Sequence, residues 1–192
     1  MVLTYNAYMH EEKEEAAMTL SFVPVKTTDD QELLARIAGE IWRGYWPSII
    51  GEAQTEYMIE KFQSYNAIVR DMAEHDYEYW LLVATQSDED GMEKSIVGFT
   101  GGHNEPETNR FFISKIYLFP ESRGHGYARR VIEFYEDLCF ARGFEAMYLT
   151  VNKYKELGIR AYEGTGFETI DSVETDIGEG YIMDDYIMEL RF

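Results

Sequence analysis

Residues 118–130 read Leu118-Phe119-Pro120-Glu121-Ser122-Arg123-Gly124-His125-Gly126-Tyr127-Ala128-Arg129-Arg130. They join a β-branched and aromatic strand, Phe111 to Phe119, to the start of an amphipathic helix through two glycines. Glycine permits positive φ and a close approach of a ligand to the main chain. The first amides of a helix have no partner within it, and with the helix dipole they attract anions. The stretch therefore predicts a phosphate or pyrophosphate site.

This stretch is locally basic in a strongly acidic chain. The chain has 17 Lys+Arg against 36 Asp+Glu, a formal net charge of −19. Between residues 121 and 130, Arg123, Arg129 and Arg130 face a single acid, Glu121. An ordinary strand-to-helix turn would explain a glycine pair, and a dinucleotide-binding fingerprint would need a third glycine where Arg129 stands. The local charge favours an anionic ligand.

The hydrophobic pattern outside this turn alternates between helical and extended spacing. Leu34, Ile37, Ala38, Ile41 and Tyr45 predict one helix, and the apolar residues from Met58 to Met72 predict a second. Further strands, a hairpin and two more helices follow from residue type and spacing. The predicted order is strand, two helices, three strands, helix, strand, helix, two strands.

Composition limits the classes of protein and partner. The chain has 192 residues, of which 45% are hydrophobic, enough for one core, so we expect a single domain at 19–192 after an N-terminal extension at 1–18. The acidic charge disfavours nucleic acid and favours cationic partners. Cys139 is the single cysteine, and no apolar run of 18 residues occurs, so we expect a cytoplasmic protein without a membrane span. We expect no metal site, and either a monomer or a homodimer.

The turn Arg123-Gly124-His125-Gly126-Tyr127-Ala128 resembles the acyl-CoA pyrophosphate loop, Arg-x-x-Gly-x-Ala, of the GNAT N-acetyltransferase superfamily. Two later blocks, residues 148–153 and residues 161–167, are similar to the family at the family's spacing. The end of the chain, residues 180–190, resembles the last strand of a bacterial branch related to diamine and polyamine acetyltransferases. The resemblance is specific over residues 109–190 and weaker over residues 19–108.

The resemblance implies an α/β (α+β) fold of the GNAT type and acetyl-CoA as the cofactor. The sheet would be mixed and mostly antiparallel, with about seven strands, a central parallel splayed pair and four flanking helices. Pantetheine would lie in the splay, and the turn would cradle the pyrophosphate. Lys155 departs from the asparagine common in relatives, and a solvated helix face is the alternative for it. The implied cofactor residues are Ile116, Tyr117, Leu118, Arg123, Gly124, His125, Gly126, Tyr127, Ala128, Asn152 and Lys155.

Tyr162 matches the family tyrosine that protonates the departing thiolate. A packing role is the alternative for Tyr162, because the chain has 15 tyrosines. The acceptor ammonium, with a pKa near 10, must also lose a proton before it attacks. The sequence leaves this general base unassigned. The candidates are Glu40, Glu78, His103 and Asp184.

The acceptor is predicted from charge. Residues 163–189 hold nine acids and no Lys or Arg. They form either a solvated sheet face or an acidic wall in which Asp184 or Asp185 pairs with a diamine or polyamine. Trp42, Tyr45 and Trp46 lie at the end of the first helix, where relatives place residues that contact the acceptor, and core packing is the alternative for at least one of them. We therefore predict acetyl transfer to a small primary amine. The alternatives are a protein or peptide amine, or a non-catalytic acyl-CoA-binding module.

Overall fold

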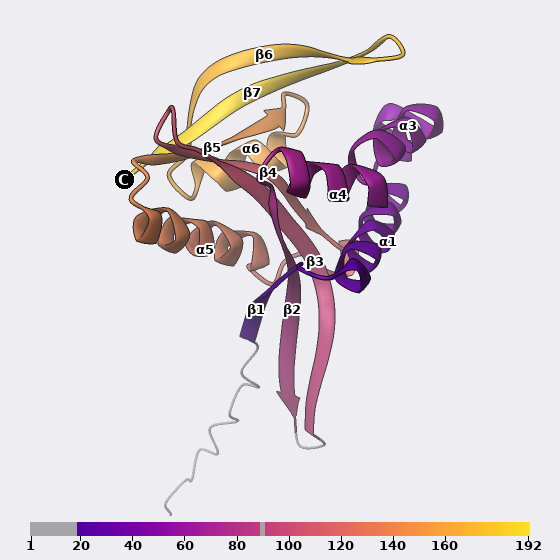
Figure 1. Ribbon diagram of the computed structural model, residues 1–192, viewed down its shortest axis with the longest axis vertical. Helices are drawn as coiled ribbons and strands as arrows, with labels where there is room; N and C mark the ends of the chain where they lie inside the picture. The colour runs from indigo at the N-terminus through magenta and orange to yellow at the C-terminus, as the bar shows by residue number, and fades with distance from the viewer. Residues whose placement is uncertain (1–18, 89–90) are drawn as a thin grey trace, which may run out of the picture.

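A computed structural model describes residues 19–88 and 91–192 (Figure 1). The expected extension at 1–18 lies outside the described residues, and so do residues 89–90 in the turn of the expected hairpin. The strands are β1 (Thr19–Pro24), β2 (Glu78–Asp88), β3 (Gly91–Glu105), β4 (Arg110–Leu118), β5 (Ala146–Asn152), β6 (Glu168–Gly178) and β7 (Tyr181–Arg191). The helices are α1 (Thr28–Tyr45), α2 (Pro47–Ile50), α3 (Glu52–Phe62), α4 (Tyr65–Glu74), the 3₁₀ turn η1 (Pro120–Ser122), α5 (Tyr127–Arg142) and α6 (Glu156–Glu163).

The strands form one seven-stranded sheet in the order β1-β2-β3-β4-β5-β7-β6. Only β4 and β5 pair in parallel among the described strands, and the other neighbours are antiparallel. The predicted mixed sheet with a central parallel pair is therefore confirmed. No helix in the described ranges is long and apolar enough to cross a bilayer.

The helical part between β1 and β2 is more divided than the sequence predicted. α1 begins at a capping box in which Thr27 and Asp30 exchange hydrogen bonds, and Pro47 starts the short α2. The single helix expected from Met58 to Met72 is instead α3 and α4. Ser64 separates them, because its side chain caps α4 by accepting a hydrogen bond from the Ala67 amide (3.3 Å). The structure thus has six α-helices in its described ranges, where about four were expected.

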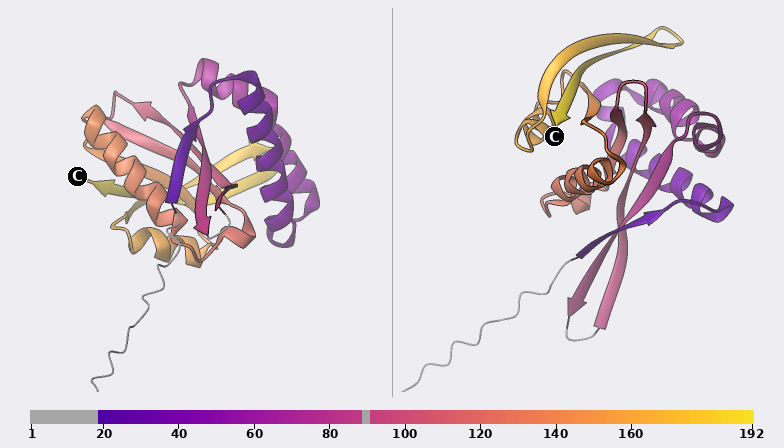
Figure 2. Two further views of the ribbon diagram at one scale, coloured as in Figure 1. Left: turned by 90° about the horizontal axis from the view of Figure 1, so that it is seen from below. Right: turned by 60° about the vertical axis from the view of Figure 1, so that its left-hand side comes forward.

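Helices cover both faces of the sheet (Figure 2). α5 and α6 pack on one face, where Val131 and Tyr135 of α5 are fully buried. α1 and α4 pack on the other face through residues such as Ile37 and Ile68. The β6–β7 hairpin extends over the α3–α4 side, and Tyr57 and Lys61 of α3 both donate hydrogen bonds to the Ile177 carbonyl oxygen.

The central parallel strands separate after four paired positions. β4 pairs with β5 from Arg110 to Ile113, and the remainder of β4 pairs only with β3. The register with β3 also shifts, because Lys115 lies opposite Gly101 and Ile113 opposite Gly102, which leaves Ser114 as the extra residue of a bulge. A bulge bends its strand, and here it lies where β4 leaves β5.

The main chain of β4 presents unpaired edge groups to this gap. The Phe119 amide donates to the Val97 carbonyl oxygen on the β3 side (3.0 Å). Backbone groups of successive residues point to alternate edges of a strand. Ile116 and Leu118 therefore direct their N–H and C=O groups toward the gap, and Tyr117 directs its own toward β3. The splay that the resemblance implied is present, with its backbone groups available to an extended ligand.

Candidate active site

The glycine turn has the conformation that a phosphate-binding loop requires. Gly124 and Gly126 have φ values of 83° and 73°, and Gly126 begins α5 without a side-chain cap. A Cβ atom added at either glycine would meet no protein atom within 4 Å. The turn is therefore open on the side where a side chain would stand, which fits a pyrophosphate against the main chain. The Arg123 amide already has a partner within the protein, because it donates a hydrogen bond to the Pro120 carbonyl oxygen (3.3 Å).

Two cations stand on aromatic rings beside this turn. The Arg123 guanidinium lies 4.5 Å from the Tyr45 ring centroid, and the Lys155 ammonium lies 3.8 Å from that of Trp46. Burial lowers the pKa of Lys155 to about 8, Asp185 opposes the shift, and Arg123 adds to it. Tyr45, which was expected to contact the acceptor, therefore contacts Arg123 and Lys155 beside the glycine turn. Lys155 is held at the predicted cofactor loop by Trp46.

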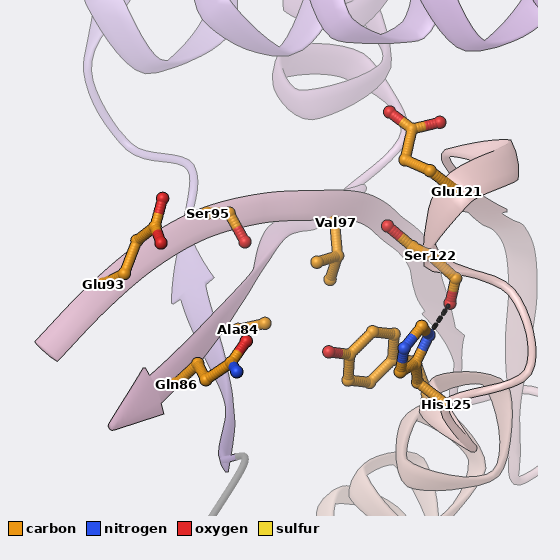
Figure 3. Close-up of a pocket in the computed structure, with 9 residues that line it drawn as sticks. Ala84, Gln86, Glu93, Ser95, Val97, Glu121, Ser122 and His125 are labelled. Carbon is orange, nitrogen blue, oxygen red and sulfur yellow. Dashed lines mark hydrogen bonds between the residues drawn. The ribbon is translucent and has the colours of Figure 1, made fainter. Parts of the chain in front are cut away.

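A small hollow of about 260 Å³ lies between this turn and the β2–β3 hairpin (Figure 3). The His125 ring points into it, with Nδ1 3.3 Å from the Ser122 carbonyl oxygen. The same ring stacks on Tyr127, at 5.6 Å between centroids. His125 is thus suited to contribute its main chain to the turn, since its side chain faces the hollow.

A second, larger cavity of about 760 Å³ lies on the opposite side of the splay from α5. We call it the acceptor pocket. Its walls come from the end of α1, from α3 and α4, from β4 and β5, and from the β6–β7 hairpin. The lining residues are Trp42, Met58, Lys61, Phe62, Gln63, Arg70, Asp71, His75, Tyr77, His103, Phe112, Ser114, Lys115, Tyr117, Thr150, Val173, Thr175, Asp176, Ile177, Met183 and Asp185.

Three buried side chains of this lining carry polar atoms that need a partner. Trp42 Nε1, Gln63 Oε1 and Asp185 Oδ1 have no hydrogen-bond partner among the residues that the structure describes. Buried polar groups are nearly always satisfied, and an orphaned one costs about 1–3 kcal/mol. One donor and two acceptors without partners in one cavity lining indicate a site for a polar ligand.

Asp185 is the acid that the structure brings to the splay. It lies on β7 opposite Asn152, the last residue of β5, and is 5% exposed. Burial raises the pKa of its carboxyl group, Asp184 raises it further, and Lys155 and Asn152 oppose the shift. A carboxylate with a raised pKa is a better proton acceptor than an exposed one.

Tyr117 lies near Asp185 and near a second phenol, Tyr162. Burial raises the pKa of Tyr117, whose side chain lines the acceptor pocket, and neighbouring Tyr162 and Asp185 raise it further. Burial also raises the pKa of Tyr162 to about 12, so this phenol keeps its proton at neutral pH. Tyr162 is half-buried on α6, and its ring lies 5.8 Å from that of Phe167. It therefore packs in the core and carries a transferable proton, so both roles considered for it are compatible.

The four base candidates do not meet at one place. Glu40 is exposed on α1, and Glu78 pairs with Arg142 (2.9 Å). Asp184 forms an ion pair with Lys153 and is not part of the pocket lining. His103 does line the pocket, with its ring 4.8 Å from that of Tyr77.

The predicted acidic wall is mostly a solvated surface. Six of the nine acids are exposed: Glu163, Glu168, Asp171, Glu174, Asp176 and Glu179. Glu189 is buried and pairs with Arg110 (3.2 Å). Of the nine, Asp176 and Asp185 line the acceptor pocket. No group of His, Cys, Asp and Glu suited to a metal ion occurs within residues 19–88 and 91–192.

The sequence did not reveal an ion pair in the wall of the pocket. Lys115 of β4 is 6% exposed, and its Nζ lies 2.7 Å from Tyr79 Oη and 3.5 Å from Asp71 Oδ2. Burial lowers the pKa of Lys115 to about 8, and Asp71 opposes the shift. A lysine inside a strand of aromatic and β-branched residues was the available signal, because such a position is rarely solvated.

Comparison with known proteins identifies a family for this chain. The family model described as "Acetyltransferase (GNAT) family" matches residues 36–167. A search of curated proteins finds no match.

Solved structures share the fold at low identity. A coenzyme A complex of the PaiA N-acetyltransferase from Thermoplasma acidophilum superposes with a TM-score of 0.66 at 22% identity, covering 92% of this chain and 99% of that one. A GCN5-related N-acetyltransferase from Rhodopseudomonas palustris gives 0.64 at 16% identity, covering 92% and 96%. A chimera of the spermidine N-acetyltransferase SpeG from Vibrio cholerae and hSSAT gives 0.62 at 17% identity, covering 90% and 94%.

Proposed function

The chain belongs to the GNAT acetyltransferase family, whose members use acetyl-CoA, and from this premise we propose that it acetylates a small primary amine. The observation that carries the proposal is Asp185. Its carboxylate is buried, one of its oxygens has no partner in the described protein, and it faces a cavity that adjoins the splay. An ammonium group supplies both the charge and the hydrogen bonds that this oxygen lacks.

Residues of β4 and the glycine turn would hold the cofactor, which supplies an acetyl thioester as the electrophile. The main chain of Ile116 and Leu118 would pair with pantetheine as an added strand does. The amides from Gly124 to Ala128 would bind the pyrophosphate, and Asn152 and Lys155 border the splay from the β5 side. Tyr117 would contribute its side chain to the pocket more than its main chain to the cofactor.

Two residues would move protons during transfer. Asp185 would take the proton that the acceptor ammonium must lose, and the free amine would then form the C–N bond. Tyr162 would give its proton to the sulfur as the C–S bond breaks, and the resulting phenolate would take the second proton that the nitrogen loses as the amide forms. General acid–base catalysis of this kind is worth about 10²–10⁴-fold each.

The acceptor we propose is a diamine or polyamine. Asp185 and Asp176 line the pocket, Trp42 and Tyr117 offer ring faces to an alkyl chain or a cation, and one similar structure is a spermidine N-acetyltransferase. A protein or peptide amine is the second candidate, and it would need room for an extended chain beside the cavity that the β6–β7 hairpin borders. A non-catalytic module would bind acetyl-CoA without turnover.

The first test is a screen for turnover. The protein would be mixed with acetyl-CoA and single amines, and free thiol would be followed. We expect thiol release above the amine-free rate with small diamines. Acetyl-CoA binding with no amine-dependent release across diamines, monoamines and peptides would favour the non-catalytic module.

Changing Gly126 should weaken acetyl-CoA binding. A Gly126→Val side chain would stand where the turn is open and would strain a residue at φ 73°. Losing one or two charge-assisted bonds at about 1.5–3 kcal/mol each predicts an affinity loss of tenfold or more, measured by calorimetry. Gly143→Ala, at the far end of α5, controls for strain at a left-handed glycine and should bind normally. Unchanged affinity in folded Gly126→Val would move the pyrophosphate site elsewhere.

Acceptor binding should weaken with salt. Exposed charges more than about 8–10 Å apart are screened at 0.1–0.15 M ionic strength, whereas a buried contact persists. KM for 1,4-diaminobutane should therefore rise from low to moderate salt and then level off. The rise should be smaller for butylamine, which carries one charge. Equal KM values for the two at low salt, or a preferred anionic acceptor, would contradict a cationic acceptor.

A further inference from the structure

One wall of the acceptor pocket holds a lysine in the way that a protein binds an ammonium ligand. We call Asp71, Tyr77, Tyr79 and Lys115 the Lys115 cage. The Lys115 ammonium lies 2.7 Å from Tyr79 Oη and 3.5 Å from Asp71 Oδ2. The ring centroids of Tyr77 and Tyr79 lie 5.2 Å and 4.9 Å from it. A carboxylate, a phenol oxygen and two ring faces together form a binding site for a primary ammonium.

The cage belongs to the acceptor pocket and not only to the core. Asp71, Tyr77 and Lys115 all line the cavity, and they come from α4, the segment before β2, and β4. The bulge at Ser114 turns Lys115 to this side of the sheet, so that Ser114, Lys115 and Tyr117 all face the pocket.

The negative charge of the cage is already compensated. Asp71 pairs with Arg70 (3.2 Å) as well as with Lys115, and it accepts a hydrogen bond from Tyr79 (3.2 Å). Two cations against one carboxylate leave this wall with a net positive charge. A second ammonium brought here would meet like charges, which costs several kcal/mol at an interface.

We propose that Lys115 is a specificity-determining residue whose own ammonium fills a primary-ammonium site in the acceptor pocket, so that short diamines are acetylated in preference to long polyamines. The proposal rests on the proposed amine acetyltransfer. A short diamine would keep both ammonium groups near Asp185 and Asp176, the two carboxylates of the pocket lining outside the cage. A longer polyamine has further ammonium groups, and these are excluded from the Lys115 cage.

The first experiment compares selectivity in two matched variants. Lys115→Met removes the ammonium and retains most of the side-chain volume. We expect the ratio of kcat/KM for spermine to that for 1,4-diaminobutane to rise about tenfold or more, because a spermine ammonium near Asp71 no longer meets the like charge of Lys115. Lys61→Met removes one positive charge from the same pocket, but Lys61 contacts Tyr57 and the Ile177 carbonyl oxygen instead of a carboxylate. The ratio for Lys61→Met should stay within about twofold of wild type. If the lost positive charge alone changed selectivity, the ratio would rise equally in both variants.

The second experiment measures ammonium binding to the cage without catalysis. Lys115→Ala leaves Asp71, Tyr77 and Tyr79 around a space the size of an alkylammonium. Butylammonium chloride should raise the Tm of this variant in a saturable manner, because a ligand that binds only the folded state stabilises it. Tetramethylammonium chloride should raise the Tm less at the same ionic strength, because it can contact the two rings but has no N–H to donate to Asp71 or Tyr79. The wild type, whose cage is filled, should show no such shift.

The outcomes separate this proposal from the proposed function. If wild type acetylates no amine, the proposed function fails, and the Tm series still decides whether the cage binds an ammonium. If wild type acetylates diamines but folded Lys115→Met gives the same ratio as Lys61→Met, the specificity role is overturned. A Lys115→Ala protein whose Tm responds equally to butylammonium and tetramethylammonium would likewise overturn the cage.

Discussion

Tyr162→Phe should lower kcat by about 10²–10⁴-fold while leaving acetyl-CoA affinity nearly unchanged. The substitution removes one oxygen and keeps the ring that packs against Phe167. Burial raises the pKa of Tyr162 to about 12, so the phenol is protonated when the sulfur leaves. Steady-state rates on one diamine, together with calorimetry for acetyl-CoA, measure the two effects separately.

Tyr117→Phe is the matched control for Tyr162. Tyr117 is a second half-buried phenol beside the same site, and burial is also the main cause of its raised pKa. Its loss should cost less than the loss of the Tyr162 hydroxyl. A larger loss in Tyr117→Phe would assign the proton to Tyr117. Equal kcat in wild type and Tyr162→Phe, with chemistry shown to be rate-limiting, would leave Tyr162 a packing residue.

Asp185→Asn should lower kcat/KM by about 10²–10⁴-fold at neutral pH, because the amide keeps the shape of the carboxylate but takes no proton. In the variant only amine that is already neutral can attack. Its rate should therefore climb about tenfold per pH unit below the amine pKa near 10, so that the defect shrinks as pH rises. A pH profile of kcat/KM for both proteins tests this.

Asp184→Asn controls for charge next to Asp185. Asp184 is the preceding residue on β7, pairs with Lys153, and does not line the acceptor pocket. Its substitution should cost less than about tenfold, the usual limit for a partly exposed pair. A defect in Asp185→Asn that is constant across pH would indicate that Asp185 binds the acceptor without taking its proton.

The sheet could be predicted because its decisive features are local in the sequence. The glycine turn, the strand before it and the helix after it occupy 32 consecutive residues from Phe111 to Arg142. The resemblance that these residues carry implied a parallel neighbour for β4, and the helix permits it because it returns the chain to the end of the sheet where β4 begins. The break between α3 and α4 was missed because it depends on one cap at Ser64 inside an otherwise regular apolar pattern.

The pocket could be predicted only in part, because its walls come from distant segments. Asp71 and Lys115 are 44 positions apart and meet only when α4 packs against β4. Asp184 and Asp185 were equivalent in the sequence, since a shift of one residue in strand register exchanges the two faces. The structure places Asp185, and not Asp184, in the lining of the pocket.

The most direct measurement is the mass spectrum of the amine after incubation with acetyl-CoA and the wild-type protein. Monoacetylated 1,4-diaminobutane should accumulate in a one-to-one ratio with the thiol released. Tyr162→Phe and Asp185→Asn should lower both products together. Thiol released without acetylated amine, or acetyl-CoA bound and not consumed with any amine, would contradict transfer from the splay of β4 and β5 to an amine held by Asp185.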